Sequence, residues 1–228
     1  NFGGGINDGG PSRDVGILKF SANGTQLLYA TYLGGSANEQ PHSMSCDASG
    51  NLYIMGTTKS TNFPYRLGVD NSHNGNYDLF VSCLSADGNN LLYSTYLGGS
   101  QNDGFNSHET TDGVNQLKYN FGDEFRGDIR LDSAGNVYIA TVTSSSQNQG
   151  LPLVSATQSN YGGALQDGWI IKLTAQLNSI LFSTYIGGNA SDAAYGLRIE
   201  GNTFYVTGGT LSSNLPASSG TVYKGGVD

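Results

Sequence analysis

The sequence predicts an all-β fold made of short strands. Its apolar runs are of strand length, and one of the longest, Leu27 to Leu33, stops at a glycine pair. No stretch of 12 residues shows a helical period, and 34 glycines supply turn positions along the chain. The same motifs also recur three times in the same order, which is typical of repeat architectures.

The clearest repeated motif is an octet of the form Tyr/Phe-Ser/Ala-Thr-Tyr-Leu/Ile-Gly-Gly-Ser/Asn. It occupies Tyr29–Ser36, Tyr93–Ser100 and Phe182–Asn189. Each octet follows an aspartate that opens an apolar run, and these leading aspartates are Asp14, Asp78 and Asp167. The chain therefore divides into three units that begin at the leading aspartates.

The expected organisation is the end of a preceding unit at 1–13, three blade units at 14–77, 78–166 and 167–227, and the start of a further unit at 228. The leading aspartates are 64 and 89 residues apart, and the last is 61 residues from Asp228. The second unit is longer because it carries an insertion at 101–128. Insertions confined to the gaps between motifs are typical of loops on a repeated scaffold.

The first hairpin of each unit is expected directly after the leading aspartate. In the first unit, strand one follows Asp14 and turns at Asn23-Gly24, a type I′ signal, into strand two at Gln26 to Leu33. Asp87-Gly88 holds the same place in the second unit. Both faces of strand two carry apolar side chains, so the sheet must be covered on both sides.

The second hairpin of each unit is expected after the Gly-Gly pair. Strand three alternates Met44 and Cys46 with serines, and the Ser49-Gly50-Asn51 turn leads into strand four at Leu52 to Thr57. Asp47 recurs as Asp132 at the corresponding turn. Because they recur, we interpret these two aspartates as turn caps rather than as catalytic carboxylates.

Four antiparallel strands per unit and two apolar faces per sheet predict a β-propeller with three four-stranded blades in this chain. A β-solenoid is the alternative, but its rungs are typically about 20 to 30 residues long. Propellers close with 4 to 8 blades, so three blades are part of a larger propeller. Further blades are expected from the same chain or from another chain.

The composition excludes several partners. Ten basic against 18 acidic residues give a net charge of −8, which leaves no basic surface for nucleic acid or for an anionic membrane. No apolar run approaches the ~20 residues of a membrane-spanning helix, so direct membrane insertion is not expected. Cys46 and Cys83 are expected to be buried thiols, with a disulfide as the alternative.

The motifs resemble the bacterial SBBP repeat, a "seven-bladed β-propeller" repeat. The resemblance lies in Asp78–Leu84, Leu92–Ser100, Asp47–Thr58 and Asn62–Pro64. It implies a secreted or cell-surface bacterial protein, often very large. Some relatives are exported by the type IX secretion system and are linked to gliding and adhesion.

One segment has the form of a calcium loop. Asp70, Ser72, Asn74 and Asp78 stand at positions 1, 3, 5 and 9 around Gly75, and such oxygen ligands suit Ca²⁺. Two of the four are neutral, and position 12 is Val81 in place of the glutamate of an EF-hand. The alternative is an ordinary Asn/Gly-rich connection.

The insertion is the candidate binding site. It contains Phe105, Tyr119, Phe121 and Phe125 among acidic residues, and aromatic side chains can stack on sugars or anchor a protein partner. A loop that packs only on itself is the alternative.

The sequence contains no G-x-S-x-G or H-E-x-x-H motif, and its three histidines do not recur. We therefore expect a non-enzymatic, extracellular or cell-surface scaffold for adhesion or protein interaction. The alternative is an accessory or glycan-binding propeller of an extracellular carbohydrate-active enzyme. The expected partner is accordingly a protein or a glycan at the cell surface.

Overall fold

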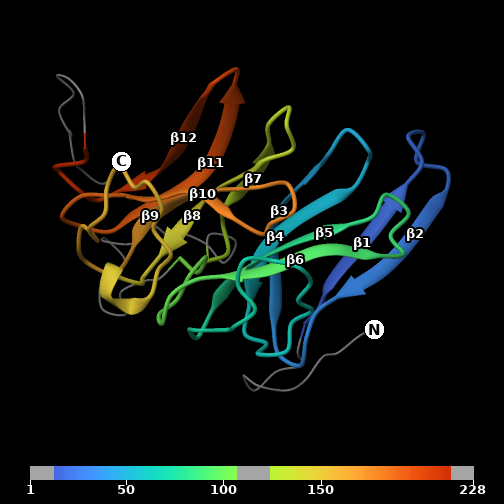
Figure 1. The fold of residues 1–228 in the computed structure, drawn as a ribbon, viewed down its shortest axis with the longest axis horizontal. Helices are drawn as coiled ribbons and strands as arrows, with labels where there is room; N and C mark the ends of the chain where they lie inside the picture. Colours follow the sequence, from blue (N-terminus) through green and yellow to red (C-terminus); the bar gives the residue numbers. More distant parts are fainter. Residues whose placement is uncertain (1–12, 107–123, 217–228) are drawn as a thin grey trace.

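The computed structural model describes residues 13–106 and 124–216, and these residues form an all-β fold (Figure 1). Helical structure in those ranges is limited to 3₁₀ conformation at Glu124 and the short 3₁₀ turn η2 (Gln147–Gln149). The strands are β1 (Val15–Phe20), β2 (Leu27–Leu33), β3 (Glu39–Cys46), β4 (Leu52–Thr58), β5 (Asp78–Leu84), β6 (Leu91–Leu97), β7 (Asp128–Leu131), β8 (Val137–Thr143), β9 (Asp167–Leu173), β10 (Ile180–Ile186), β11 (Asp192–Glu200) and β12 (Thr203–Thr210). The predicted all-β class is confirmed.

The strands form four antiparallel sheets, but their grouping differs from the predicted three four-stranded blades. Within the described residues, β3 to β6 and β7 to β10 form two four-stranded sheets, whereas β1–β2 and β11–β12 form two-stranded sheets. Each repeat unit therefore supplies the last two strands of one sheet and the first two of the next. The divisions at 14, 78 and 167 follow the sequence repeat; those at 78 and 167 fall inside four-stranded sheets, and that at 14 precedes β1.

The sheets stack face to face, and each covers the next with apolar side chains. Leu79 and Val81 on one face of β5 pack with the β7–β10 sheet, while Phe80 and Leu84 on the other face pack with β1–β2. A third cluster joins the β7–β10 sheet to β11–β12. The first strands β3, β7 and β11 contact one another in sequence along one side of the stack. The prediction that both sheet faces are apolar and covered is confirmed for the two four-stranded sheets.

The predicted turns fall at the right positions, although one turn type is wrong. A type I′ turn needs positive φ at both central residues, but only Gly24 of Asn23-Gly24 has one (71°). Its N–H donates to the Ser21 carbonyl, and Gly88 repeats that bond with Ser85. These hairpins therefore use a longer loop closed by a left-handed residue.

The aspartate turns are confirmed as self-capping. The Asp47 Oδ1 atom accepts hydrogen bonds from the Ser49 and Asn51 N–H groups at 2.8 and 2.9 Å. Asp132 makes the same pair of bonds with Ala134 and Asn136.

Both cysteines are free thiols. Cys83 is buried as expected, but Cys46 is exposed because it lies at the end of β3 on an outward face. The expectation of two buried thiols is therefore wrong for Cys46.

Candidate functional site

Two acidic side chains flank the first glycine of the Gly-Gly pair in each of the three octets. At Gly98, Asp78 Oδ1 and Asp103 Oδ2 lie 2.9 and 2.8 Å from the point that a Cβ would occupy. The same construction joins Asp14 and Glu39 at Gly34, and Asp167 and Asp192 at Gly187. Only glycine leaves room for both carboxyl groups, so the repeated Gly-Gly pair is a packing requirement.

The second acid of each pair connects one sheet to the next. Asp103 accepts hydrogen bonds from Gly99 N (2.7 Å), which follows β6, from Thr143 Oγ1 at the end of β8, and from Ser145 Oγ just after it. Equivalent bonds link Glu39 to Gly35, Thr58 and Ser60, and link Asp192 to Gly188 and Ser212. We call each such carboxyl pair with its glycine and hydroxyl donors a junction.

Sequence reasoning missed the junctions. Their signal is an acid five residues after the first glycine of each octet, together with a Thr-x-Ser motif after the second strand of each sheet. The three copies of that motif are Thr58–Ser60, Thr143–Ser145 and Thr210–Ser212. Asp103 was predicted to belong to the insertion, but it occupies the repeated acid position.

Four of the junction acids, Glu39, Asp78, Asp103 and Asp167, have raised pKa values because they are buried. Burial raises the pKa of Asp103 and of Asp167 to about 7, and the neighbouring carboxyl group adds to both shifts. The pKa values of Asp78 and Glu39 are raised for the same reason. Asp78, Asp103 and Asp167 are all 0% exposed, so they present no surface to a substrate.

The predicted calcium residues come together in one loop before β5. Asp70 Oδ1 accepts from Ser72 N (2.9 Å) and Ser72 Oγ (2.6 Å), and the Asn74 amide reaches Asp70 Oδ2. Asp78 accepts from Asn74 N (2.7 Å) and Gly75 N (3.0 Å). Both carboxylates thus bind protein N–H or O–H groups, and Ca²⁺ binding stays a prediction. Within the described residues, no three His, Cys, Asp or Glu side chains group together in a metal-binding arrangement.

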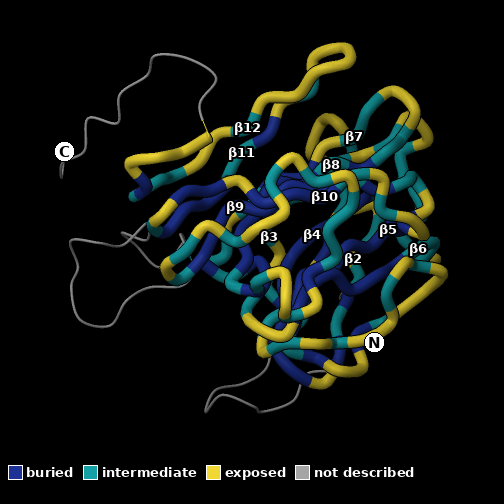
Figure 2. The backbone as a smooth tube through the Cα atoms, turned by 60° about the vertical axis from the view of Figure 1, so that its left-hand side comes forward, coloured by how far each residue is buried: buried dark blue, intermediate teal, exposed yellow. Residues whose placement is uncertain are grey.

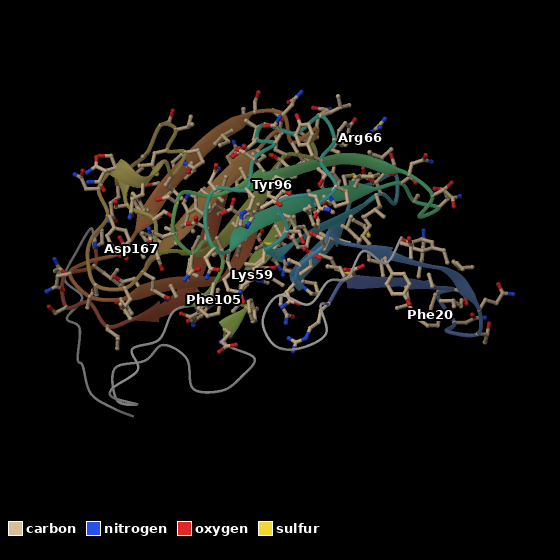
Figure 3. The ribbon with its side chains drawn as sticks, turned by 90° about the horizontal axis from the view of Figure 1, so that it is seen from below. Phe20, Lys59, Arg66, Tyr96, Phe105 and Asp167 are labelled. Atoms are coloured by element: carbon tan, nitrogen blue, oxygen red, sulfur yellow. The ribbon has the colours of Figure 1, made fainter. Side chains whose placement is uncertain are left out.

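Two predicted binding residues of the insertion lie in an aromatic cluster. Phe105 stacks on Tyr77 with ring centroids 4.9 Å apart, and Phe125 meets both rings edge to face. The Lys59 Nζ atom lies 4.4 Å from the centroid of the Tyr77 ring. We call Lys59, Tyr77, Phe105 and Phe125 the rim cluster; Figure 3 shows Phe105 close to Lys59. Tyr119 and Phe121 lie outside the described residues.

Two connections, β4 to β5 and β6 to β7, meet at the rim cluster. Lys59 follows β4, Tyr77 precedes β5, Phe105 lies between β6 and β7, and Phe125 precedes β7. The base of the insertion is closed by a hydrogen bond from Asn106 N to the Glu124 carbonyl (2.9 Å). This bond brings the two phenylalanines together although 19 residues separate them in the sequence.

Tyr77 and Lys59 were not predicted. The signal for Tyr77 is its departure from the repeat, because Arg13 and Gln166 precede the other leading aspartates.

His42 also lies beside Phe125, with ring centroids 6.1 Å apart. Its ring nitrogens are buried without a hydrogen-bond partner, and burial lowers the His42 pKa to about 3, so the ring is neutral.

The comparison with protein families agrees with the repeat seen in the sequence. Residues 28–64, from β2 to the turn after β4, match the family model of the SBBP β-propeller repeat. A search of curated proteins finds no match. The β-propeller repeat is therefore supported for part of the first unit.

Within residues 13–106 and 124–216, no helix has the length and apolarity required to cross a membrane.

The junction glycines provide a test of the packing argument. Gly98→Ala places a Cβ within 3 Å of two carboxylate oxygens, and we expect it to lower the free energy of unfolding by about 1–3 kcal/mol. Gly16→Ala is the matched control, because nothing lies within 4 Å of its Cβ position. Urea unfolding measures both variants. Equal free energies of unfolding for the two variants would contradict the claim that the junction requires glycine at this position.

The raised pKa values of the junction acids predict how stability depends on pH. The folded chain holds protons on Asp103 and Asp167 up to about pH 7, whereas an unfolded aspartate releases its proton near pH 3.9. The free energy of unfolding therefore falls as pH rises from about 4 to 7, and we expect a higher melting temperature at pH 5 than at pH 8. Asp103→Asn should reduce this difference. A melting temperature that is flat or rising over this range would refute the assignment.

Proposed function

We propose that the chain is a non-enzymatic β-propeller segment of a secreted or cell-surface bacterial protein, acting as a scaffold for adhesion and protein interaction. The stacked antiparallel sheets and the SBBP repeat match at 28–64 support the propeller. Closure needs 4 to 8 blades, which further blades from the same chain or another chain would supply. Export by the type IX system belongs to this proposal through the family resemblance.

The observation that carries the proposal is the contrast between repeated and unrepeated features. Raised pKa values often mark catalytic acids, but here they belong to junctions that recur in every unit and are closed to solvent. Catalysis needs one accessible, asymmetric site. The repeated acids are therefore assigned to structure, which favours a non-enzymatic role.

The rim cluster is the unrepeated feature suited to binding. Phe105 takes the place that Pro41 and Ala194 hold in the other units, two residues after the junction acid. The three aromatic side chains are half-buried. Their buried parts pack on the protein, and their exposed ring edges are the parts that a partner would contact. Aromatic anchors beside a cation are common at protein interfaces.

A glycan partner is the second candidate, as in an accessory propeller of an extracellular carbohydrate-active enzyme. The three aromatic rings at one rim favour it, because such rings stack on sugars. Against it, Tyr77 is already in contact with Phe105 and with the Lys59 ammonium group. We therefore place the protein partner first.

Bead adhesion tests the proposal and separates the two partners. Beads coated with the chain flow over a layer of bacterial cells. We expect the cells to retain the beads, and we expect protease treatment of the cells to abolish this retention. Tyr77→Ala and Phe105→Ala should each reduce retention about tenfold, the scale of one lost aromatic anchor. Tyr205→Ala, an exposed tyrosine on β12, should not.

Melting curves must show that each variant is folded. Retention that survives protease, with binding to a glycan array that Phe105→Ala removes, would favour the glycan partner. Absence of retention on the cells and of binding on the array would contradict both candidates.

A further inference from the structure

Residues 65–70 run along the outer edge of the β3–β6 sheet, of which β6 is the last strand. They pair with β6 through two backbone hydrogen bonds, from Arg66 N to the Ser94 carbonyl (3.1 Å) and from Ser94 N to the Arg66 carbonyl (2.8 Å). At the other end of the segment, Asp70 N donates to Thr95 Oγ1 (2.9 Å). The segment is therefore fixed to the sheet at both ends, and we call it the first strap.

The β7–β10 sheet carries an equivalent segment at residues 153–158, the second strap. Val154 exchanges the same two backbone hydrogen bonds with Ser183 of β10, at 3.2 and 2.8 Å. Gln158 N donates to Thr184 Oγ1 (2.8 Å), as Asp70 N does to Thr95. The two straps can therefore be compared position by position. The matching pairs are Tyr65 with Leu153, Leu67 with Ser155, and Val69 with Thr157.

The first strap exposes apolar side chains where the second strap does not. Tyr65, Leu67 and Val69 are 45%, 62% and 39% exposed. At the matching positions the second strap has two small polar residues, and its Leu153 packs against the core between the two four-stranded sheets. The exposed apolar surface is thus a feature of this one loop and not of the repeat.

The first strap has an interior position in the stack. It belongs to a sheet that packs against a described sheet on each side, and β5 of that sheet is buried throughout (Figure 2). Val69 N donates to the Leu177 carbonyl (2.8 Å), in the turn between β9 and β10, so the strap is also tied to the following sheet. The exposure of its side chains is therefore not that of a sheet at the end of the stack.

Leu67 combines exposed apolar area with an unfavourable backbone conformation. Its φ angle is 54°, in the left-handed region that only glycine adopts without a steric penalty. Ser155 has a φ angle of 48° at the matching position, so the path of a strap requires a left-handed residue there. Glycine would meet that requirement without exposing a hydrophobic side chain. Backbone strain and exposed apolar area are both associated with binding sites.

The side chains on either side of Leu67 in the first strap add polar groups. The Tyr65 hydroxyl donates to the Gly68 carbonyl (2.9 Å), which holds its ring beside the strap. Arg66 is exposed, and within residues 13–106 and 124–216 no acidic side chain forms an ion pair with it. The first strap thus presents a guanidinium group among hydrophobic side chains.

We propose that the first strap is a docking surface for a protein segment that carries an acidic residue next to large apolar residues. The apolar residues of the partner pack on Tyr65, Leu67 and Val69, and its carboxylate pairs with the Arg66 guanidinium group. Tyrosine and arginine are enriched among the residues that dominate protein interfaces. Because the strap is already fixed to β6, little further ordering is needed on binding.

The first strap is a second surface, separate from the rim cluster. Figure 3 shows Arg66 well apart from Lys59 and Phe105. The inference extends the proposed interaction role to this surface and does not depend on what the rim cluster binds. Peptide binding in solution tests the strap without cells, so failure of the bead assay and failure of this inference are distinct results.

Selection from a phage library of short random peptides tests the docking surface. The purified chain is the bait, and we expect enriched peptides that combine large apolar residues with Asp or Glu. Fluorescence polarisation measures the affinity of synthetic copies. Leu67→Gly and Arg66→Glu should each weaken binding about tenfold or more, and Phe105→Ala should leave it unchanged.

Ser155→Gly is the matched control for Leu67→Gly. Each replaces the left-handed residue of a strap by glycine, and we expect both to melt close to the wild-type chain. Relief of the left-handed conformation offsets the larger conformational entropy of an unfolded glycine. Only Leu67→Gly should lose peptide binding.

Three results would overturn the proposal. The first is that no such peptides are enriched, and the second is that they bind Leu67→Gly as tightly as the wild-type chain. The third is that phosphatidylglycerol vesicles, and not peptides, bind the chain in a way that Leu67→Gly abolishes. If Leu67→Gly does not fold, the affinity of Arg66→Glu decides the question.

Discussion

The fold depends on pairs of buried carboxyl groups that share a glycine where one sheet meets the next. At each junction the second acid accepts the N–H of the Gly-Gly pair and the hydroxyl hydrogens at the end of a strand in the following sheet. A buried carboxyl group costs free energy when no hydrogen-bond donor faces it, and costs more when it is charged. The junction therefore fixes which strand end faces which glycine, and so fixes the order of the sheets.

The junctions also explain where the chain tolerates variation. The long insertion leaves the second unit just after Asp103 and returns before β7, and the bond between Asn106 and Glu124 closes its base. The junction at Gly98 is unaffected by the length of the loop between them. The rim cluster, where we propose that a partner binds, stands on this closed base, and the repeated contacts are unchanged.

The sequence predicted strands, turns and aspartate caps because each leaves a local pattern. It did not predict how the strands group into sheets, since a repeat can be divided at any point and the pairing of Thr58 with Asp78 crosses a 19-residue loop. The site was predicted in part. Phe105 and Phe125 stood out as aromatics in an insertion, whereas Lys59 and Tyr77 join them only through the sheet stacking. Asp103 was hidden because its Thr143 and Ser145 donors are 40 and 42 residues away.

Amide hydrogen exchange at Gly35, Gly99 and Gly188 tests the junctions most directly. These N–H groups lie in loops, where backbone amides commonly exchange fast, yet each donates to a buried carboxyl oxygen at 3.1, 2.7 and 2.7 Å. The account predicts exchange about a thousandfold slower than in an unprotected loop, at rates that approach those of the central strands. Exchange at the rate of an unprotected loop amide would contradict it.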